Sequence, residues 1–250
     1  MDAQKTGFWR SLPGILTGLA AMITAVGGLY LALSDRSEDG PQVEPSPPIP
    51  QPPPPKPEWT VLADEAFVSL PNGWPAGRFA ARLVPQMERN VLEGKYRWSL
   101  QFGDAFTGPT WAHLFNLPYG PKVEFYAAID ISIVEASGYV AVALVFGKSG
   151  ESDYAFKISP PNLYTLYRYD GENSIVLVDW TPGDFDTSRP VRIAVESVGG
   201  RLSFFINSKK VGEQLWHQDF LGGGFALSVS SRKNQSVVVD FDNFVLKEPN

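Results

Sequence analysis

Residues 122–134 of the chain read Lys122-Val123-Glu124-Phe125-Tyr126-Ala127-Ala128-Ile129-Asp130-Ile131-Ser132-Ile133-Val134. Apolar side chains occupy every second position from Val123 to Ile133, and most of the positions between them are polar. Successive side chains of a β-strand point to opposite faces, so this alternation predicts a long strand with one face in a hydrophobic core. A helix would not keep these apolar residues on one side, because its period is 3.6 residues.

The same two-residue period recurs in much of the chain beyond Trp59. It is clearest in four further stretches, which span residues 191–196, 202–207, 225–230 and 237–242. Turn signals separate the stretches, and they are Ser149-Gly150, Asp170-Gly171, Gly199-Gly200 and Asn207-Ser208. About 12 strands joined by tight turns predict an all-β fold, namely a two-sheet antiparallel jelly-roll sandwich.

The composition divides the 250 residues into four segments. They are a short N-terminus (1–11), an apolar segment (12–33), a proline-rich linker (34–58) and the β-sandwich domain (59–248). No charged residue lies between Arg10 and Asp35. About 20 apolar helical residues span a bilayer core of roughly 30 Å, so the apolar segment predicts one transmembrane helix. Two alternatives stay open: a signal peptide cleaved after the Ala32-Leu33-Ser34 site, and a buried core helix.

Basic residues flank the apolar segment unequally. Lys5, Arg10 and the terminal amine precede it, whereas Arg36 follows it among acidic residues. The positive-inside rule therefore predicts a single-pass protein of the cytoplasmic membrane with its N-terminus in the cytoplasm. The β domain then lies in the periplasm or at the cell surface.

The linker is dominated by proline. Ten prolines lie between Gly40 and Glu58. Proline lacks an amide donor and restricts φ, so neither helix nor sheet forms there, and a semi-rigid polyproline II spacer is expected. Docking of a partner on the Pro-x-x-Pro segments is the alternative.

Small residues recur every four positions in the apolar segment, at Ala20, Thr24, Gly28 and Ala32. This spacing lets two membrane helices approach closely, so it predicts that the chain associates with itself through the helix. The alternative is that glycine and alanine are simply common in membrane helices.

Composition excludes several classes of function. The net charge is −6 and no basic run occurs, so nucleic-acid binding has no electrostatic basis. The absence of cysteine excludes disulfides and thiolate metal sites. The two histidines, His113 and His217, are far apart in sequence, which disfavours a zinc enzyme. Gly222-Gly223-Gly224 precedes a predicted strand rather than a helix, so it indicates a loop and not a phosphate site.

Four stretches of the β domain carry a family resemblance. They are Tyr164-Thr165-Leu166-Tyr167-Arg168-Tyr169-Asp170-Gly171, Leu177-Val178-Asp179-Trp180-Thr181, Gly200-Arg201-Leu202-Ser203-Phe204-Phe205-Ile206-Asn207 and Val239-Asp240-Phe241-Asp242-Asn243-Phe244. Their order resembles the concanavalin A-like lectin/glucanase superfamily, in particular bacterial extracellular jelly-roll domains near the laminin-G and 3-keto-disaccharide hydrolase groups. The resemblance covers residues 58–247 and implies the fold, since these motifs are strands and turns. Residues 8–17 resemble a membrane-anchor module found ahead of varied bacterial extracytoplasmic domains.

The resemblance also provides a test for catalysis. Jelly-roll glycosidases of this superfamily often carry Glu-x-Asp-x-x-Glu on one strand, with the two glutamates as nucleophile and acid. Here Asp130 fits the central aspartate, but Ala128 and Ile133 stand where the glutamates would be. We therefore expect no catalytic residues of that type.

Two acidic residues are candidates for binding a metal ion. Asp240 and Asp242 share one face of a predicted strand and precede Asn243, so their oxygens offer ligands for calcium. The alternative is a hydrogen-bonded terminal strand without a metal. No other cofactor is expected.

Aromatic residues suggest where a ligand would bind. The candidates for ligand contact are Tyr164, Arg168, Trp180 and Trp111. Sugars stack on aromatic rings, although aromatic rings also fill β cores. Alternation puts Tyr167 and Tyr169 on one face with Leu163 and predicts that this face lies in the core, with Tyr164 and Arg168 on the other face.

These observations predict a membrane-anchored extracytoplasmic binding module, non-catalytic, that presents a carbohydrate- or protein-binding β-sandwich. Its partners would be the membrane and a glycan or an envelope protein, with no nucleic acid. Two alternatives are a sugar-processing enzyme whose site has no recognised motif and a structural protein of envelope assembly.

Overall fold

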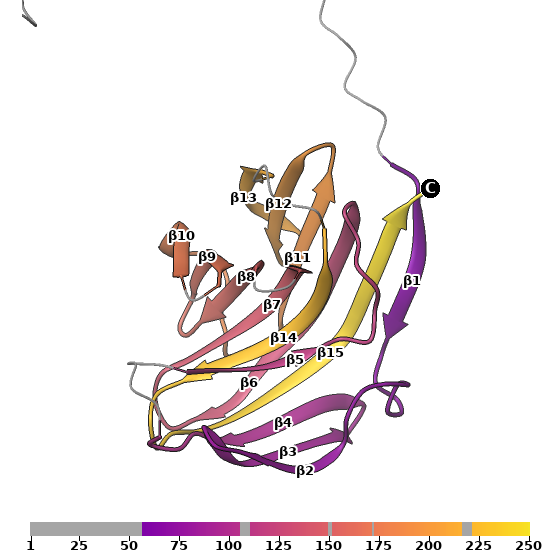
Figure 1. Cartoon of the computed structure of the whole chain (residues 1–250). Helices are drawn as coiled ribbons and strands as arrows, with labels where there is room; N and C mark the ends of the chain where they lie inside the picture. Colours follow the sequence, from indigo (N-terminus) through magenta and orange to yellow (C-terminus); the bar gives the residue numbers. More distant parts are fainter. Residues whose placement is uncertain (1–56, 106–110, 150–151, 172, 217–221) are drawn as a thin grey trace, which may run out of the picture. The chain divides into compact units, whose positions relative to one another are not determined.

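The computed structural model describes residues 57–105, 111–149, 152–171, 173–216 and 222–250, without the side chains of residues 111–113. These residues form fifteen β-strands, which assemble into two antiparallel sheets (Figure 1). The predicted all-β class and the two-sheet antiparallel sandwich are therefore confirmed.

The two sheets interleave segments that are distant in sequence. The nine-stranded sheet has the spatial order β13 (Lys209–Leu215), β12 (Arg201–Ile206), β11 (Val191–Val198), β6 (Phe125–Ala136), β15 (Ser236–Pro249), β4 (Lys95–Gln101), β3 (Val84–Leu92) and β2 (Gly77–Ala81), and β1 (Trp59–Glu65) also pairs with β15. The six-stranded sheet has the order β10 (Asn173–Pro182), β9 (Leu163–Asp170), β8 (Ser152–Ser159), β7 (Val140–Ser149), β14 (Gly224–Ser231) and β5 (Trp111–Asn116).

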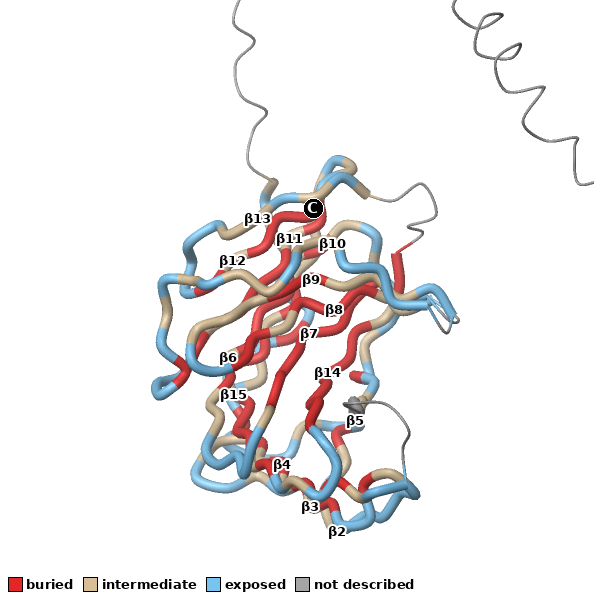
Figure 2. The backbone as a smooth tube through the Cα atoms, turned by 90° about the vertical axis from the view of Figure 1, so that its left-hand side faces the viewer, coloured by how far each residue is buried: buried red, intermediate tan, exposed pale blue. Residues whose placement is uncertain are grey.

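The main hydrophobic core lies between the sheets. Phe125 and Ile129 of β6 point into it, as the alternation predicts, and they belong to one cluster with Leu144, Phe156 and Leu227 of the six-stranded sheet. Each fully buried side chain of this kind contributes about 1.5–3 kcal/mol through removal of apolar surface from water. Figure 2 shows that burial extends along nearly the whole of β7 and β14 at the centre of the six-stranded sheet.

Two of the predicted hairpin turns have the backbone that tight turns require. Gly199 and Gly200, between β11 and β12, have φ angles of +57° and +80°. Asn207 and Ser208, between β12 and β13, have φ angles of +48° and +67°. Two successive residues with positive φ form the type I′ geometry that matches the twist of a hairpin, so both predictions are confirmed.

Strand β15 organises the nine-stranded sheet. It pairs with β6 along one side, while β4 and then β1 pair along its other side. The register with β6 shifts between Asp242 and Val245, and Asn243 has a φ angle of +49°. The closing motif of the family resemblance is therefore a β-bulge, which bends the strand where its partner changes.

The segment before residue 122 is where strand prediction fell short. Five strands, β1 to β5, lie there, and the total of fifteen exceeds the expected number of about 12. Most residues of β1 and β2 are exposed, so these strands lack a continuous apolar face that alternation would reveal.

A close approach between backbones explains the glycine at position 223. A Cβ atom there would lie 2.3 Å from the carbonyl carbon of Gly147 and 2.4 Å from the amide nitrogen of Lys148. Gly223 also forms a β-bridge with Lys122. The glycines predicted as a loop therefore let the start of β14 pack against the end of β7.

The predicted transmembrane helix, its seam at Ala20, Thr24, Gly28 and Ala32, and the proline linker up to residue 56 lie outside the described residues. Within the described ranges, no helix has the length and apolarity needed to cross a bilayer.

Candidate functional site

The outer face of the six-stranded sheet is lined with small side chains at its centre. Cross-strand register brings Ala226 of β14, Val145 of β7 and Ala155 of β8 into one row. With Ala143 they form a second hydrophobic cluster, separate from the main core. We call these four residues the floor; they are at most 2% exposed, and Leu114 and Tyr169 pack against them.

Two tyrosines and a lysine stand beside this floor. Register places Tyr167 next to Ala155, and Lys157 between Ala143 and Thr165. The Lys157 ammonium donates a hydrogen bond of 2.6 Å to the hydroxyl of Tyr169. It also lies 4.7 Å and 5.2 Å from the ring centroids of Tyr167 and Tyr169. The two rings are stacked, 6.1 Å apart with an interplanar angle of 19°.

Further charged groups surround this trio. Asp153 lies directly opposite Tyr169 in the ladder, and its carboxylate is 3.7 Å from the ammonium of Lys148. At one end of the sheet, the guanidinium carbon of Arg232 lies 5.6 Å from the ring centroid of Tyr139. We call the set Tyr139, Lys148, Asp153, Lys157, Tyr167, Tyr169 and Arg232, with its floor, the tyrosine–lysine face.

Burial shifts the pKa values of this face in consistent directions. Desolvation lowers the pKa of Lys157 to about 8, although Asp153 acts in the opposite sense. Desolvation also raises the pKa of Asp153, and it raises the pKa of Tyr169 to about 12. A group of titratable side chains shifted by burial and by one another is a frequent property of binding and catalytic sites.

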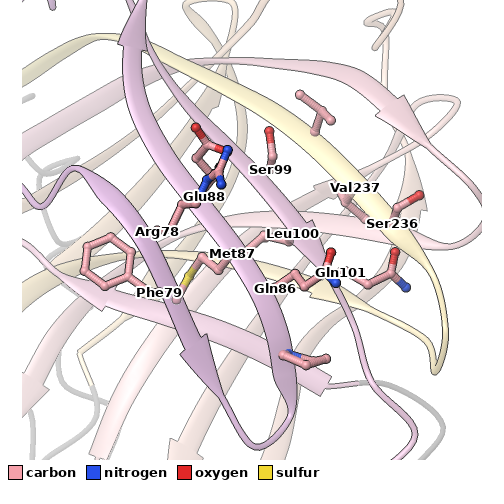
Figure 3. Close-up of a pocket in the computed structure, with 12 residues that line it drawn as sticks. Arg78, Phe79, Gln86, Met87, Glu88, Ser99, Leu100, Gln101, Ser236 and Val237 are labelled. Atoms are coloured by element: carbon pink, nitrogen blue, oxygen red, sulfur yellow. Dashed lines mark ion pairs between the residues drawn. The ribbon is translucent and has the colours of Figure 1, made fainter.

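A second hollow lies on the other sheet. A pocket of about 670 Å³ crosses β2, β3, β4 and β15 on the outer face of the nine-stranded sheet. Figure 3 shows Arg78, Glu88 and Ser99 at one part of this pocket and Gln86 and Gln101 at another. Arg78 and Glu88 form an ion pair of 3.5 Å. The pocket is therefore lined by the amides of Gln86 and Gln101 and the hydroxyl of Ser99, while the charges of Arg78 and Glu88 are paired with each other.

The calcium candidates also lie on the outer face of the nine-stranded sheet. Both carboxylate oxygens of Asp240 accept hydrogen bonds from Arg97, at 2.6 and 2.8 Å. Asp242 accepts a hydrogen bond from the backbone amide of Asn243. Within the described ranges, no three acidic or histidine side chains gather around a point that would hold a metal ion. The Asp240–Asp242 calcium site stays a prediction, and it would require Arg97 to release Asp240.

The partial glycosidase motif has a structural role in β6. Asp130 accepts hydrogen bonds of 2.8 Å from both Arg192 and Asn243. Ala128 is fully buried, and Asp242 is the cross-strand partner of Asp130. Both oxygens of Asp130 are thus engaged by neighbouring strands.

The four residues predicted to contact a ligand do not converge on one surface. Tyr164 packs against the main core, and its hydroxyl donates a hydrogen bond of 3.2 Å to the carbonyl of Val211. Arg168 shares the inner face of β9 with Tyr164. Trp180 lies at a register shift in β10, and Trp111 opens β5 with its side chain outside the described set. Their role in binding stays a prediction.

The predicted faces of β9 are reversed in the structure. Leu166 is buried in the main core, whereas Tyr169 packs on the outer cluster. The prediction was wrong because both faces of β9 carry tyrosine, so alternation alone cannot orient the strand. The signal lay in β8, where the large side chains of Tyr154, Phe156 and Ile158 alternate with small or polar ones. Antiparallel pairing with β8 then orients β9.

Comparison with known proteins identifies the fold. No family model matches the sequence, and no curated protein matches it. The structure is similar to the catalytic domain of an endo-1,3-β-glucanase (laminarinase) from Thermotoga petrophila, at 10% identity and a TM-score of 0.56, covering 78% of this chain and 100% of that one. It is also similar to a β-glucanase from Bacillus licheniformis, at 11% identity and a TM-score of 0.54, covering 75% of this chain and 98% of that one. A κ-carrageenase from Zobellia galactanivorans is similar at 10% identity and a TM-score of 0.53, covering 78% of this chain and 97% of that one.

The described domain therefore has the concanavalin A-like jelly-roll fold of these enzymes, as the sequence resemblance implies. At 10–11% identity the likeness establishes the fold alone. Function has to be argued from the residues of this chain.

Proposed function

We propose that this protein is a non-catalytic carbohydrate-binding module held outside the cytoplasmic membrane by an N-terminal anchor. The observation that carries the proposal is the tyrosine–lysine face, where two stacked tyrosine rings lie beside a lysine and a carboxylate on the outer face of the six-stranded sheet. The fold supports it only as a scaffold, because the concanavalin A-like sandwich serves both binding modules and hydrolases.

The chemistry of the face suits a sugar. A pyranose has an apolar face of C–H bonds, which packs on aromatic rings, and a rim of hydroxyls, which need donors and acceptors. Tyr167 and Tyr169 supply rings, Lys157 supplies donors and Asp153 supplies acceptors. Binding of a sugar at these side chains is therefore chemically reasonable.

Catalysis of the glycosidase type has no comparable support. The strand that resembles the catalytic strand has Ala128 and Ile133 in place of glutamates, and Asp130 is engaged by Arg192. A hydrolase of that kind needs two carboxyl groups about 5 Å apart flanking the bond to be cleaved. The proposal accordingly assigns binding without turnover.

The position of the module in the cell rests on the sequence. The apolar segment 12–33 would anchor it, the basic residues Lys5 and Arg10 would keep its N-terminus in the cytoplasm, and the linker 34–58 would hold the sandwich away from the bilayer. Packing at Ala20, Thr24, Gly28 and Ala32 would pair two copies and give two binding faces. Protease treatment of intact cells and of lysed cells tests this arrangement: degradation of the sandwich only after lysis of the cytoplasmic membrane would contradict it.

Glycan binding by the full chain in mild detergent tests the function. The experiment is a screen of immobilised glycans, followed by titration of each ligand found with the Tyr167→Ala variant. Removing one stacking ring should weaken binding about tenfold, since such contacts contribute about 1–1.5 kcal/mol. Tyr126→Ala is the matched control, because Tyr126 also lies beside a lysine (Lys247, 5.7 Å) but on the nine-stranded sheet.

Either of two results would overturn the proposal. One is the absence of binding to any glycan by protein whose near-ultraviolet circular dichroism shows a packed core. The other is equal loss of affinity in Tyr167→Ala and Tyr126→Ala.

A further inference from the structure

The tyrosine–lysine face has a charge property that goes beyond sugar binding in general. We propose that it selects glycans with an anionic substituent, a carboxylate or a sulfate ester, and that Lys157 binds this substituent. The inference rests on the proposed function and names its ligand class.

The hydrogen bonding of Lys157 is incomplete. An ammonium group has three N–H donors. Within the described residues, one of them is used, in the bond to the Tyr169 hydroxyl. The nearby carboxylate, Asp153, forms its ion pair with Lys148 instead. Two donors of a half-buried cation are thus left for a ligand.

The surroundings of Lys157 favour an oxyanion as that ligand. Removing a cation from water is costly unless an opposite charge or hydrogen bonds replace the water. Cation–π attraction to the rings of Tyr167 and Tyr169 offsets part of the cost of removing Lys157 from water. A sugar hydroxyl would accept a hydrogen bond but add no charge. A carboxylate or sulfate would do both, and charge-assisted hydrogen bonds are about twice as strong as neutral ones.

The balance of charge on the face points the same way. Its defining residues include three cations, Lys148, Lys157 and Arg232, against one carboxylate, Asp153. The face therefore carries a local excess of two positive charges, whereas the whole chain has a net charge of −6. Arg232 lies over the ring of Tyr139 and forms no ion pair among the described residues. An acidic glycan running toward Tyr139 would meet a second cation there.

The pocket on the nine-stranded sheet lacks this property. Its arginine, Arg78, is paired with Glu88, and its other polar groups, such as Gln86, Gln101 and Ser99, are uncharged (Figure 3). The preference for an acidic sugar is therefore assigned to the tyrosine–lysine face and not to that pocket.

Matched pairs of polysaccharides test the inference with the full chain in mild detergent. Polygalacturonate is compared with its carboxyl-reduced product, and dextran sulfate with dextran, by isothermal titration calorimetry at low and at physiological salt. We expect at least tenfold tighter binding to one or both acidic members than to their neutral partners. The pair that shows the preference tells whether a carboxylate or a sulfate ester is the ligand.

Variants connect the preference to one side chain. Lys157→Gln should remove the tenfold preference, because it removes the charge while keeping a side chain that can donate hydrogen bonds. Lys157→Arg should retain the preference. Lys247→Gln is the matched control, since it removes a lysine beside a tyrosine on the other sheet, and it should leave the preference intact. Circular dichroism verifies that each variant is folded.

A pH series gives an independent readout. The groups facing Lys157 are Asp153, Tyr167 and Tyr169, with Lys148 and Tyr139 beyond them. With a pKa of about 8, Lys157 loses its charge as the pH rises from 7 to 9, whereas the pKa of Tyr169, about 12, lies well above this range. The preference should therefore decline over this range in the wild type and persist in Lys157→Arg.

The outcomes separate the inference from the proposed function. Equal affinity for acidic and neutral members overturns the inference and leaves carbohydrate binding standing. A preference that survives Lys157→Gln, or that Lys247→Gln also abolishes, overturns the assignment to this face. If the protein binds no member of either pair and no glycan in the screen, both the inference and the proposed function are overturned.

Discussion

Replacing Asp240 by asparagine tests what holds the centre of the nine-stranded sheet. Asp240 and Arg97 are cross-strand partners in β15 and β4, joined by hydrogen bonds of 2.6 and 2.8 Å. Asp240 is only 2% exposed, whereas 27% of the Arg97 side chain is exposed. Breaking a buried pair costs about 3–5 kcal/mol, and the partial exposure of Arg97 reduces this. We expect Asp240→Asn to lower the free energy of unfolding by about 2–3 kcal/mol.

Thermal unfolding of the full chain, followed by circular dichroism with calcium and with a chelator, measures this loss. For a domain of this size, about 2–3 kcal/mol corresponds to a decrease in Tm of about 5–10 °C. The decrease should be the same in both buffers, because the structure assigns the carboxylate to Arg97. Glu213→Gln is the control: its carboxylate pairs with Arg201 at the surface, and Tm should not change measurably.

Calcium binding at Asp240 and Asp242 would give a different pattern. A ligand that binds only the folded state stabilises it by about 2.7 kcal/mol at a hundredfold excess over Kd. Calcium would then raise the Tm of the wild type, and Asp240→Asn would abolish that increase. This pattern, or a change in Tm of less than about 1 °C in both buffers, would refute the ion-pair argument.

Two further predictions concern backbone packing and pH. Gly223→Ala should lower the free energy of unfolding by about 2–3 kcal/mol in urea titrations, because the added Cβ would overlap the backbone of β7. Gly120→Ala is the control and should be neutral, since no atom lies within 4 Å of a Cβ at that position. Equal effects of the two substitutions would contradict the packing argument. Lys157 releases its proton near pH 8 when folded but near 10.5 when unfolded. The unfolded state thus binds more protons between pH 8 and 10, so stability should rise by about 1–2 kcal/mol over that range. Lys157→Met should abolish the rise, and an equal rise in the variant would disprove its origin.

The strands of the second half of the domain were predictable because each buries one face. Phe125 and Ile129 mark that face in β6, and polar residues mark the other. Hairpin turns were predictable for a local reason, since glycine and asparagine, as in Gly199-Gly200 and Asn207-Ser208, adopt positive φ more readily than other residues. The first strands were harder, because β1 and β2 are largely exposed and carry no clear alternation.

The candidate site was much less accessible to prediction. Lys157, Asp153 and Tyr167 are each unremarkable in the sequence, and they come together only because β8 pairs with β9 in one register. A shift by one residue would have turned Tyr167 into the core. Similarly, the sequence alone suggests Asp240 as a metal ligand, because its ion pair with Arg97, 143 residues away, is visible only in the structure.

The sequence by itself determined the all-β class, the hairpins, the absence of the glycosidase glutamates and the expectation of an anchor and spacer. These depend on local properties: alternation of apolar residues, turn chemistry, residue identity at a motif and length of an apolar run. Only the tertiary structure decided which face of β9 is outside and that Arg97 forms an ion pair with Asp240. It also decided that Lys157 lies beside two tyrosines with hydrogen-bond donors available for a ligand. Those features depend on pairing between strands that are distant in sequence. The free energy of that pairing comes from contacts across the whole core, so no single segment of the sequence determines it.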